Sequence, residues 1–273
     1  MLDEFQPSAI HISTEGPLGL AARRHCLKNG YEFTTAYHTR FPEYIHARWR
    51  VPLGVSYRWV RWFHSPASRI MVSTSSIEEA LKGRKFDRIA RWTRGVDTSL
   101  FHPRDKGFLS DPRPISMYVG RVAVEKNIEA FLKLDIPGTK YVVGDGPQLT
   151  ELRARYPDVR FPGAKTGEEL ARHYAASDVF VFPSLTDTFG LVMLEALASG
   201  VPVAAYPVEG PLDVIEGSGA GALDSDLAKA VERALGIPPE DCLAHARNYS
   251  WEASARQFLG NLEILEPPAG MAA

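Results

Sequence analysis

The feature that most constrains the fold of this chain is an alternation of short β-rich runs with helical stretches. The β-rich runs are residues 9–12, 33–37, 69–72 and 88–92, followed by 115–119, 140–143, 159–161, 179–182 and 201–205. Strands that alternate with helices form parallel sheets through crossover connections. The run Val179-Phe180-Val181-Phe182 is apolar on both faces, as a central parallel strand should be. The pattern predicts an α/β fold with two doubly wound parallel sheets.

The two series of strands predict two domains joined at the turn Gly95-Val96-Asp97-Thr98. We expect a first domain over 1–97, a second over 98–249, a C-terminal helix over 250–265 that packs back toward the first domain, and a flexible tail over 266–273. The second series suffices for a complete doubly wound domain, whereas the first has about four strands where six or more are normal. We therefore expect that two or three βα units are missing from the start of the chain.

Composition argues against several classes of protein. The chain has 31 Lys and Arg against 33 Asp and Glu, a net charge of -2, so it is not a basic protein that binds nucleic acid through bulk charge. Cys26 and Cys242 lie far apart and outside any zinc-ligand spacing, which fits a reducing compartment. The sequence shows neither a signal-peptide pattern nor an apolar run of the roughly 18 residues that a membrane span needs. We expect a cytoplasmic location.

Positive charge is concentrated between Arg40 and Arg104, where 13 Lys and Arg stand against 5 Asp and Glu, a local net charge of +8. Here arginines alternate with aromatic residues. The residues are Arg48, Trp49, Arg50, Arg58, Trp59, Arg61 and Trp62. This pattern suits an anionic membrane surface, such as the inner face of the plasma membrane. An amphipathic helix that packs Val55, Trp59 and Trp62 into a core explains the spacing equally well.

A glycine-rich run, Gly217-Ser218-Gly219-Ala220-Gly221, resembles a dinucleotide-binding fingerprint. However, no acidic residue follows a second strand about 20 residues later, as the fingerprint of a dehydrogenase requires. We instead expect the chain to enter a helix directly, with Asp224 as the N-cap and Leu227 and Val231 in the buried stripe.

Polar segments follow the predicted strands of the second domain, at the edge where open α/β sheets bind ligands. After the first strand, Gly120 allows close backbone approach, Arg121 offers a planar cation, and Lys126 lies near a helix start. This combination predicts a diphosphate site in preference to a loop with solvated cations. Gly144 and Gly163 end the next two strands; direct ligand contact and a purely structural turn explain them equally well.

The last of these segments contains Asp187, Phe189, Gly190, Leu191 and Glu195. Gly190 opens a predicted helix, whose free N–H groups favour negative charge. Glu195 lies about 7.5 Å further along the helix axis, at about 1.5 Å per residue. One ligand can reach both places, with ribose hydroxyls donating to the carboxylate. A simple salt bridge of Glu195 on the helix face is less favoured, because its neighbours are apolar.

The motifs Gly120-Arg121…Glu125-Lys126-Asn127 and Val143-Gly144-Asp145-Gly146-Pro147, with acids at Asp187 and Glu195, resemble the retaining glycosyltransferases of family 4. The resemblance covers about 7–265 and implies the GT-B fold, in which two Rossmann-like domains face a cleft, the first being incomplete here. The sequences TEGPLG at 14–19 and HTRFPEY at 38–44 are similar to members that glycosylate lipids, such as phosphatidylinositol mannosyltransferases and sulfoquinovosyl-lipid synthases.

The resemblance also implies roles for individual residues. Arg121 and Lys126 stabilise the diphosphate leaving group, and Glu195 holds the ribose. Asp187 and the backbone amides that follow it contact the donor sugar and phosphate. His38 directly follows a predicted strand, and we assign it to positioning the transferred sugar. Asp187 departs from the usual Glu of the family, and nothing here matches the Gly-rich acceptor loop of the missing strands.

The predicted reaction is a retaining transfer of a hexose from a UDP- or GDP-linked donor to a hydroxyl group of a lipid or sugar. Arg121, Lys126 and the helix start oppose the charge that builds on the diphosphate, so neither a cofactor nor a metal is expected. A glycosidase would need two carboxylates but would have no use for these cations. The alternative from another class is a truncated module that binds the nucleotide sugar without turnover.

Overall fold

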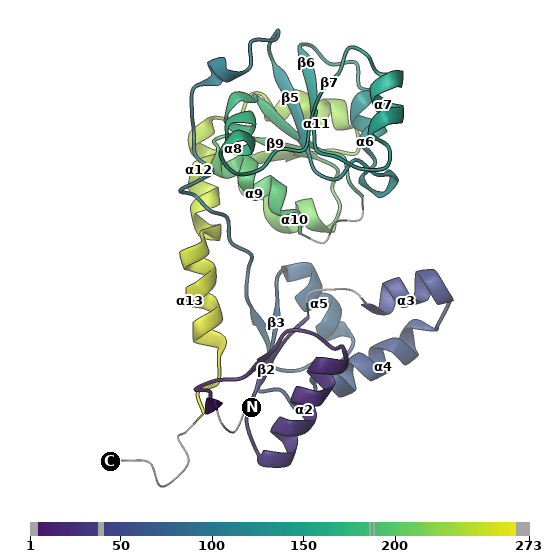
Figure 1. The fold of residues 1–273 in the computed structure, drawn as a ribbon, viewed down its shortest axis with the longest axis vertical. Helices are drawn as coiled ribbons and strands as arrows, with labels where there is room; N and C mark the ends of the chain where they lie inside the picture. The colour runs from purple at the N-terminus through teal and green to yellow at the C-terminus, as the bar shows by residue number, and fades with distance from the viewer. Residues whose placement is uncertain (1–4, 38–40, 186, 188, 266–273) are drawn as a thin grey trace. The chain divides into compact units, whose positions relative to one another are not determined.

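The computed structural model describes residues 5–37, 41–185, 187 and 189–265. The chain forms two compact units, one made of residues 1–93 with 254–273 and the other of residues 94–253. In each unit, helices pack on a parallel sheet (Figure 1). The predicted flexible tail over 266–273 lies outside the described residues.

The first unit contains a four-stranded parallel sheet in the order β1-β2-β3-β4. Its strands are β1 (His11–Ile12), β2 (Thr34–Tyr37), β3 (Arg69–Val72) and β4 (Ile89–Arg91). The helices between them are α2 (Pro17–Asn29), α3 (Phe41–Trp49), α4 (Leu53–His64) and α5 (Ser75–Gly83). Of these elements, α3 was not predicted. Its first turn contains Pro42, which reads as a helix breaker although proline is tolerated at that position.

Most of the last helix, α13 (Trp251–Asn261), belongs to the first unit. Trp92 Nε1 donates to Ser254 Oγ at 3.2 Å, and Asn261 Nδ2 donates to the carbonyl of Arg91 at 2.7 Å. These bonds tie α13 to the end of β4, so residues far apart in the sequence build one unit.

The second unit contains a six-stranded parallel sheet in the order β10-β9-β8-β5-β6-β7. Its strands are β5 (Ile115–Val119), β6 (Thr139–Val143), β7 (Arg160–Gly163), β8 (Val179–Phe182), β9 (Val203–Ala205) and β10 (Gly221–Leu223). Its α-helices are α6 (Ile128–Leu132), α7 (Leu149–Arg155), α8 (Gly167–Ala176), α9 (Leu191–Ala198), α10 (Glu209–Ile215), α11 (Leu227–Ala234) and α12 (Pro239–Ala246). This is the strand order of a doubly wound, Rossmann-like domain.

Both faces of the second sheet are covered. Met117 and Val119 of β5 pack in a cluster with α8, α9 and α12, while the intervening Tyr118 packs in another cluster with α6, α7 and α11. Alternate side chains of a strand point to opposite faces, and both faces are apolar here. The apolar character of Val179-Phe180-Val181-Phe182 therefore has the predicted cause: β8 is a central strand with all four side chains buried.

Two local predictions for the second unit are wrong. The single helix predicted to start near Lys126 is a 3-10 turn (Val124–Lys126) followed by the short α6, because Asn127 adopts a left-handed conformation with φ 52° and interrupts the helix. The glycine-rich run leads into β10 and not directly into a helix, and Asp226 is the N-cap of α11 in place of Asp224. The Asp224 carboxylate instead accepts the N–H of Asp226 at 2.9 Å, a local bond that competes with helix capping.

Candidate active site

The chain reverses direction across the second sheet between β5 and β8. From β5 the chain continues outward to β6 and β7, and from β8 it continues outward on the other side to β9 and β10. The loops after β5 and β8 therefore diverge at the carboxyl edge and leave the crevice in which open α/β sheets bind ligands. The predicted site residues Arg121 and Lys126 follow β5, and Asp187 and Glu195 follow β8.

An ion pair joins the two sides of this switch point. Lys126 Nζ donates to both carboxylate oxygens of Asp187, at 2.6 and 2.9 Å. Asn127 adds a second link, since its Nδ2 donates to the carbonyl of Pro183 at 3.0 Å. The side chains of Lys126 and Asp187 are 27% and 24% exposed, so water and an incoming anion can reach the pair. A diphosphate would compete with Asp187 for Lys126.

At the same edge, the side chain of Arg121 is more exposed than that of Lys126. Its side chain is 66% exposed and 3.5 Å from Glu125, an exposed ion pair of a kind that contributes little to stability. Its backbone carbonyl accepts the hydroxyl of Tyr118 at 3.0 Å. Burial, with the nearby carboxylates of Asp187 and Glu125, raises the pKa of Tyr118 well above its usual range, so this hydroxyl stays protonated as a donor. The backbone is thus held while the guanidinium can move onto a ligand.

Gly144 and Gly163, which lie at the ends of two strands at this edge, have different structural surroundings. A Cβ on Gly144 would lie 1.9 Å from the carbonyl oxygen of Gly120, so the two loops can approach only without a side chain at 144. This supplies a structural reason for Gly144. Gly163 has a left-handed φ of 82°, but a Cβ there would meet nothing within 4 Å. Its carbonyl accepts the N–H of Gly144 at 3.0 Å, which links the ends of β6 and β7.

The helix after β8 begins one residue later than predicted. Gly190, with φ 77°, is the N-cap of α9, and a Cβ there would lie 2.9 Å from Cε of Met193. The side chain of Phe189 is buried edge-on against Tyr249, which leaves its backbone as the part that can contact a ligand. Leu191 is exposed at the first turn of α9.

Glu195 on α9 has a buried partner. Its Oε2 accepts the hydroxyl of Tyr174 at 2.8 Å, and Tyr174 is completely buried. Glu195 also lines a cavity of about 180 Å³ with Asp97 and Trp251. Burial raises the pKa of Glu195, and the hydrogen bond from Tyr174 partly opposes this effect. Among the described residues no cation forms an ion pair with Glu195, so the alternative of a simple salt bridge on the helix face does not apply.

Sequence reasoning missed two residues that support this site. Tyr174 lies in the buried stripe of α8 and looked like an ordinary core residue. Gly210, at the start of α10, brings its backbone against the loop after β8: a Cβ there would lie 2.5 Å from the carbonyl oxygen of Asp187. Only the phenolic oxygen of Tyr174, which needs a partner when buried, was a signal in the sequence.

The remaining residues singled out in the sequence lie in the first unit. His38 lies outside the described residues, directly after β2. In the basic aromatic stretch, Trp49, Trp59 and Trp62 are 65%, 41% and 50% exposed, and Val55 is 50% exposed. The alternative interpretation, in which an amphipathic helix packs Val55, Trp59 and Trp62 into a core, is therefore wrong. The side of α4 that is buried carries Ser56, Tyr57, Val60, Phe63 and His64.

Comparison with known protein families matches both units. The family model described as "Glycosyltransferase Family 4" matches residues 1–100, and the one described as "Glycosyl transferases group 1" matches residues 113–236. A GDP-mannose-dependent alpha-mannosyltransferase of Mycobacterium tuberculosis is 31% identical over 280 residues, which cover 96% of this chain and 74% of the relative. The alpha-monoglucosyldiacylglycerol synthase of Streptococcus pneumoniae is 28% identical over 93% of this chain and 65% of its own length.

Solved structures show the same fold. The sucrose-phosphate synthase of Thermosynechococcus elongatus superposes with a TM-score of 0.77 and 25% identity, over 95% of this chain and 74% of that structure. The chain therefore belongs to the family 4 glycosyltransferases and has the GT-B fold. It is a glycosyltransferase, as the sequence motifs predicted, and the matches support this activity over a binding module without turnover.

The burial of Glu195 leads to a prediction about stability. Because its pKa is raised in the folded state, the folded protein binds more protons than the unfolded chain at pH values between the ordinary glutamate pKa, about 4.3, and the raised value. The charge of Glu195 should therefore cost stability as pH rises through that window. We expect Glu195→Gln to unfold at a higher denaturant concentration than wild type at pH 7, with the difference shrinking at pH 4. A difference that is constant with pH would contradict this account.

Proposed function

We propose that this chain transfers a hexose from a nucleoside diphosphate sugar to a hydroxyl group of a lipid, with retention of the anomeric configuration. The observation that carries the proposal is the convergence of Arg121, Lys126 and the start of α9 at the switch point of the second sheet. GDP-mannose is the first donor to test, because a relative that is 31% identical is named for its dependence on it.

The proposed chemistry is electrostatic. Cleavage of the anomeric C–O bond leaves negative charge on the diphosphate, and positioned cations and helix N–H groups lower the free energy of that state. In the free protein, Asp187 neutralises Lys126. On binding, the diphosphate replaces Asp187 as the partner of Lys126, and the released carboxylate is free to accept hydroxyls of the sugar. The acceptor hydroxyl then attacks the anomeric carbon from the face that the leaving group occupies, its proton passes to an oxygen of the departing diphosphate, and no metal ion takes part.

Glu195 is proposed to hold the ribose. Its carboxylate is charged only at a cost, because burial raises its pKa and it has one described donor, Tyr174. Two ribose hydroxyls would supply the missing donors. The hydroxyl of Tyr174 fixes the orientation of the carboxylate for this contact. The ribose would thus stabilise a charge that the free protein carries unfavourably.

A lipid acceptor is supported by an apolar cavity in the first unit. The cavity has a volume of about 470 Å³ and lies between α3, α4 and the start of α2. Its walls include Phe41, Val55 and Trp59, which are 40–50% exposed. We propose that the acyl region of the lipid acceptor covers these side chains. The relative named alpha-monoglucosyldiacylglycerol synthase makes diacylglycerol the first acceptor to test.

The exposed tryptophans also support docking on an anionic membrane, in keeping with an enzyme at the inner face of the plasma membrane. Trp49, Trp59 and Trp62 expose their rings, and Arg50 and Arg58 beside them are exposed as well. The side chain of Arg48 lies outside those described. Among the described residues, no helix combines the length and the apolar character that a membrane crossing requires. Interfacial aromatic rings with basic neighbours suit peripheral attachment.

Transfer itself is tested with radiolabelled GDP-mannose and diacylglycerol in detergent, in the presence of EDTA. We expect labelled lipid from the wild-type chain.

Arg121→Ala should weaken binding of the nucleoside diphosphate by about 2 kcal/mol, since a hydrogen bond to a charged group is worth about 1.5–3 kcal/mol. Arg153→Ala removes an exposed arginine of α7 and is the matched control. The proposal fails if folded Arg121→Ala binds GDP and UDP as tightly as wild type by calorimetry.

The role of Glu195 is tested by comparing two ligands. If it holds ribose, Glu195→Gln should weaken binding of GDP at least about tenfold, because a charge-assisted hydrogen bond is lost, and should leave inorganic pyrophosphate nearly unaffected. Tyr174→Phe should reduce GDP affinity in the same direction but by less. Equal losses for GDP and pyrophosphate would show that Glu195 supports the fold and does not contact the ribose.

Membrane docking is tested by co-sedimentation with vesicles. We expect stronger binding to phosphatidylglycerol-containing than to phosphatidylcholine vesicles, falling as salt rises, because each surface Lys or Arg contributes about 1 kcal/mol. The variant with Arg48, Arg50, Arg58 and Arg61 changed to Gln should lose this binding. The matched control changes Lys133, Arg153, Arg155 and Lys229 to Gln. Docking through this stretch is wrong if the two variants sediment alike.

A further inference from the structure

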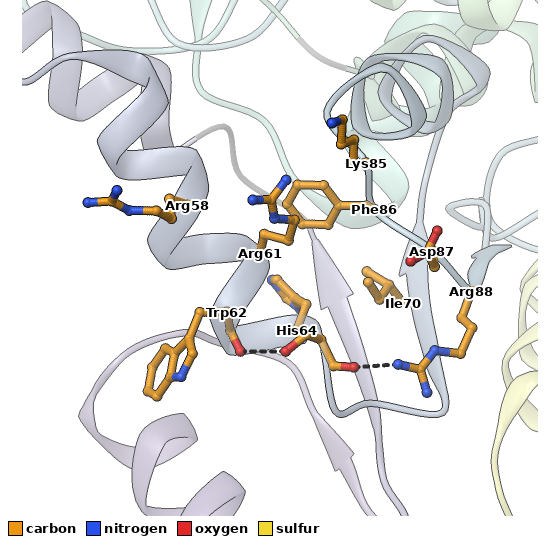
Figure 2. A pocket seen from close by; sticks show the side chains of 10 residues that line it. Arg58, Arg61, Trp62, His64, Ile70, Lys85, Phe86, Asp87 and Arg88 are labelled. Carbon is orange, nitrogen blue, oxygen red and sulfur yellow. Dashed lines mark hydrogen bonds between the residues drawn. The ribbon is translucent and has the colours of Figure 1, made fainter.

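The first unit contains a second cavity, and none of the candidate active-site residues of the second unit lines it. It has a volume of about 590 Å³ and lies between α4 and the turn that joins α5 to β4. Arg58 and Arg61 of α4 line it together with Lys85 and Arg88 of the turn (Figure 2). Asp87 is the one carboxylate among the lining residues, all of which are described. Four cations against one acid make this wall strongly positive.

The cations of this cavity are not neutralised. Among the described residues, no carboxylate forms an ion pair with Arg58, Arg61, Lys85 or Arg88, whereas nearby Lys82 lies 2.7 Å from Glu78. Like charges that share a cavity repel each other, and a concave wall of one sign concentrates the field.

Hydrogen bonds to backbone carbonyls position Arg61 and Arg88 without neutralising their positive charges. Arg61 Nη1 donates to the carbonyl of Arg84 at 3.2 Å, and Arg88 Nη2 donates to the carbonyl of Ser65. An arginine has five N–H donors, so most of those on Arg61 and Arg88 remain for a ligand.

The turn also carries unfavourable backbone conformations at two of its three basic residues. Lys85 has φ 63° and Arg88 has φ 56°, both in the left-handed region that long side chains seldom adopt. At the end of α5, Phe86 N–H donates to the carbonyl of Leu81 at 3.1 Å and Lys85 N–H to that of Lys82 at 3.0 Å. This is a Schellman ending, in which the residue at position 85 is usually glycine. Strain of this kind, retained where a charged side chain enters a cavity, points to a binding role.

The size and the remaining walls indicate the kind of ligand. Trp62 is half exposed at the rim, while Phe86 and Ile70 are buried behind the cations. A volume of about 590 Å³ falls within the range of small-molecule sites and exceeds what one phosphate ion fills. The planar guanidinium of an arginine can donate two parallel hydrogen bonds to phosphate oxygens, and the ammonium of a lysine adds a compact positive charge.

We propose that this cavity binds a phosphomonoester, with the phosphate group on Arg61, Lys85 and Arg88 and the organic body toward the rim at Trp62. The ligand is either a soluble metabolite or the headgroup of a lipid that carries a terminal phosphate. The proposal does not depend on the transferase reaction, because none of these residues belongs to the second unit.

Two probes with the same phosphomonoester chemistry distinguish the sources. Glycerol 3-phosphate is titrated by calorimetry into the full chain, and vesicles containing phosphatidic acid are compared with vesicles containing phosphatidylglycerol by co-sedimentation. We expect Lys85→Gly and Arg88→Gln each to weaken binding of the probe at least about tenfold, as loss of a hydrogen bond to a charged group does. Lys82→Gln removes a neighbouring cation outside the cavity and should bind like wild type. Arg121→Ala should also bind like wild type.

Lys85→Gly separates binding from folding. Glycine relieves the left-handed strain, so this variant should unfold at a higher denaturant concentration than wild type while binding the probe more weakly. Binding of glycerol 3-phosphate supports a soluble ligand, and binding only to phosphatidic acid vesicles supports a lipid headgroup. The proposal is overturned if neither probe binds, or if Lys85→Gly and Lys82→Gln reduce binding equally.

Discussion

The position of β5 beside β8 is the constraint on which the candidate active site depends. These two strands are parallel neighbours, yet the chain continues from them in opposite directions across the sheet. Their following loops diverge, and the crevice between them receives Arg121 and Lys126 from one side and Asp187 from the other. On the β5 side, the loop after β5 packs closely against the loop after β6, because Gly144 has no Cβ to clash with the carbonyl of Gly120. Sheet topology thus decides which charges can act on one ligand.

The charged side chains at this edge are stabilised to different extents in the free protein. Lys126 is neutralised by Asp187, Arg121 is held in water by a weak pair with Glu125, and Glu195 is partly desolvated with Tyr174 as its described donor. In the proposed complex, a nucleoside diphosphate offers oxygens to the cations and hydroxyls to the carboxylates. Ligand binding would therefore exchange contacts within the protein for contacts that the transition state strengthens.

Helix α4 in the first unit is one amphipathic segment whose side chains line two different cavities. Val55 and Trp59 line an apolar cavity, whereas Arg58 and Arg61 line a basic one. Tyr57 and Phe63, two of the side chains by which the helix packs into the core of the unit, line neither cavity. The apolar spacing that looked like a core stripe is thus divided between packing and exposed surface. Spacing alone could not separate these, because both uses repeat at three and four residues.

Local patterns in the sequence were enough to predict most elements, the α/β class and the polar residues at the ends of β5 and β8. Periodicity, turn chemistry and strand length are local properties, and β5 and β8 were predicted with the bounds that the structure shows. The pairing of Lys126 with Asp187, the hydrogen bond from Tyr174 to Glu195 and the placement of Lys85 and Arg61 around one cavity were decided only by the tertiary structure. Each joins residues on different elements. Their contact depends on strand order and side-chain direction, which no local stretch of sequence contains.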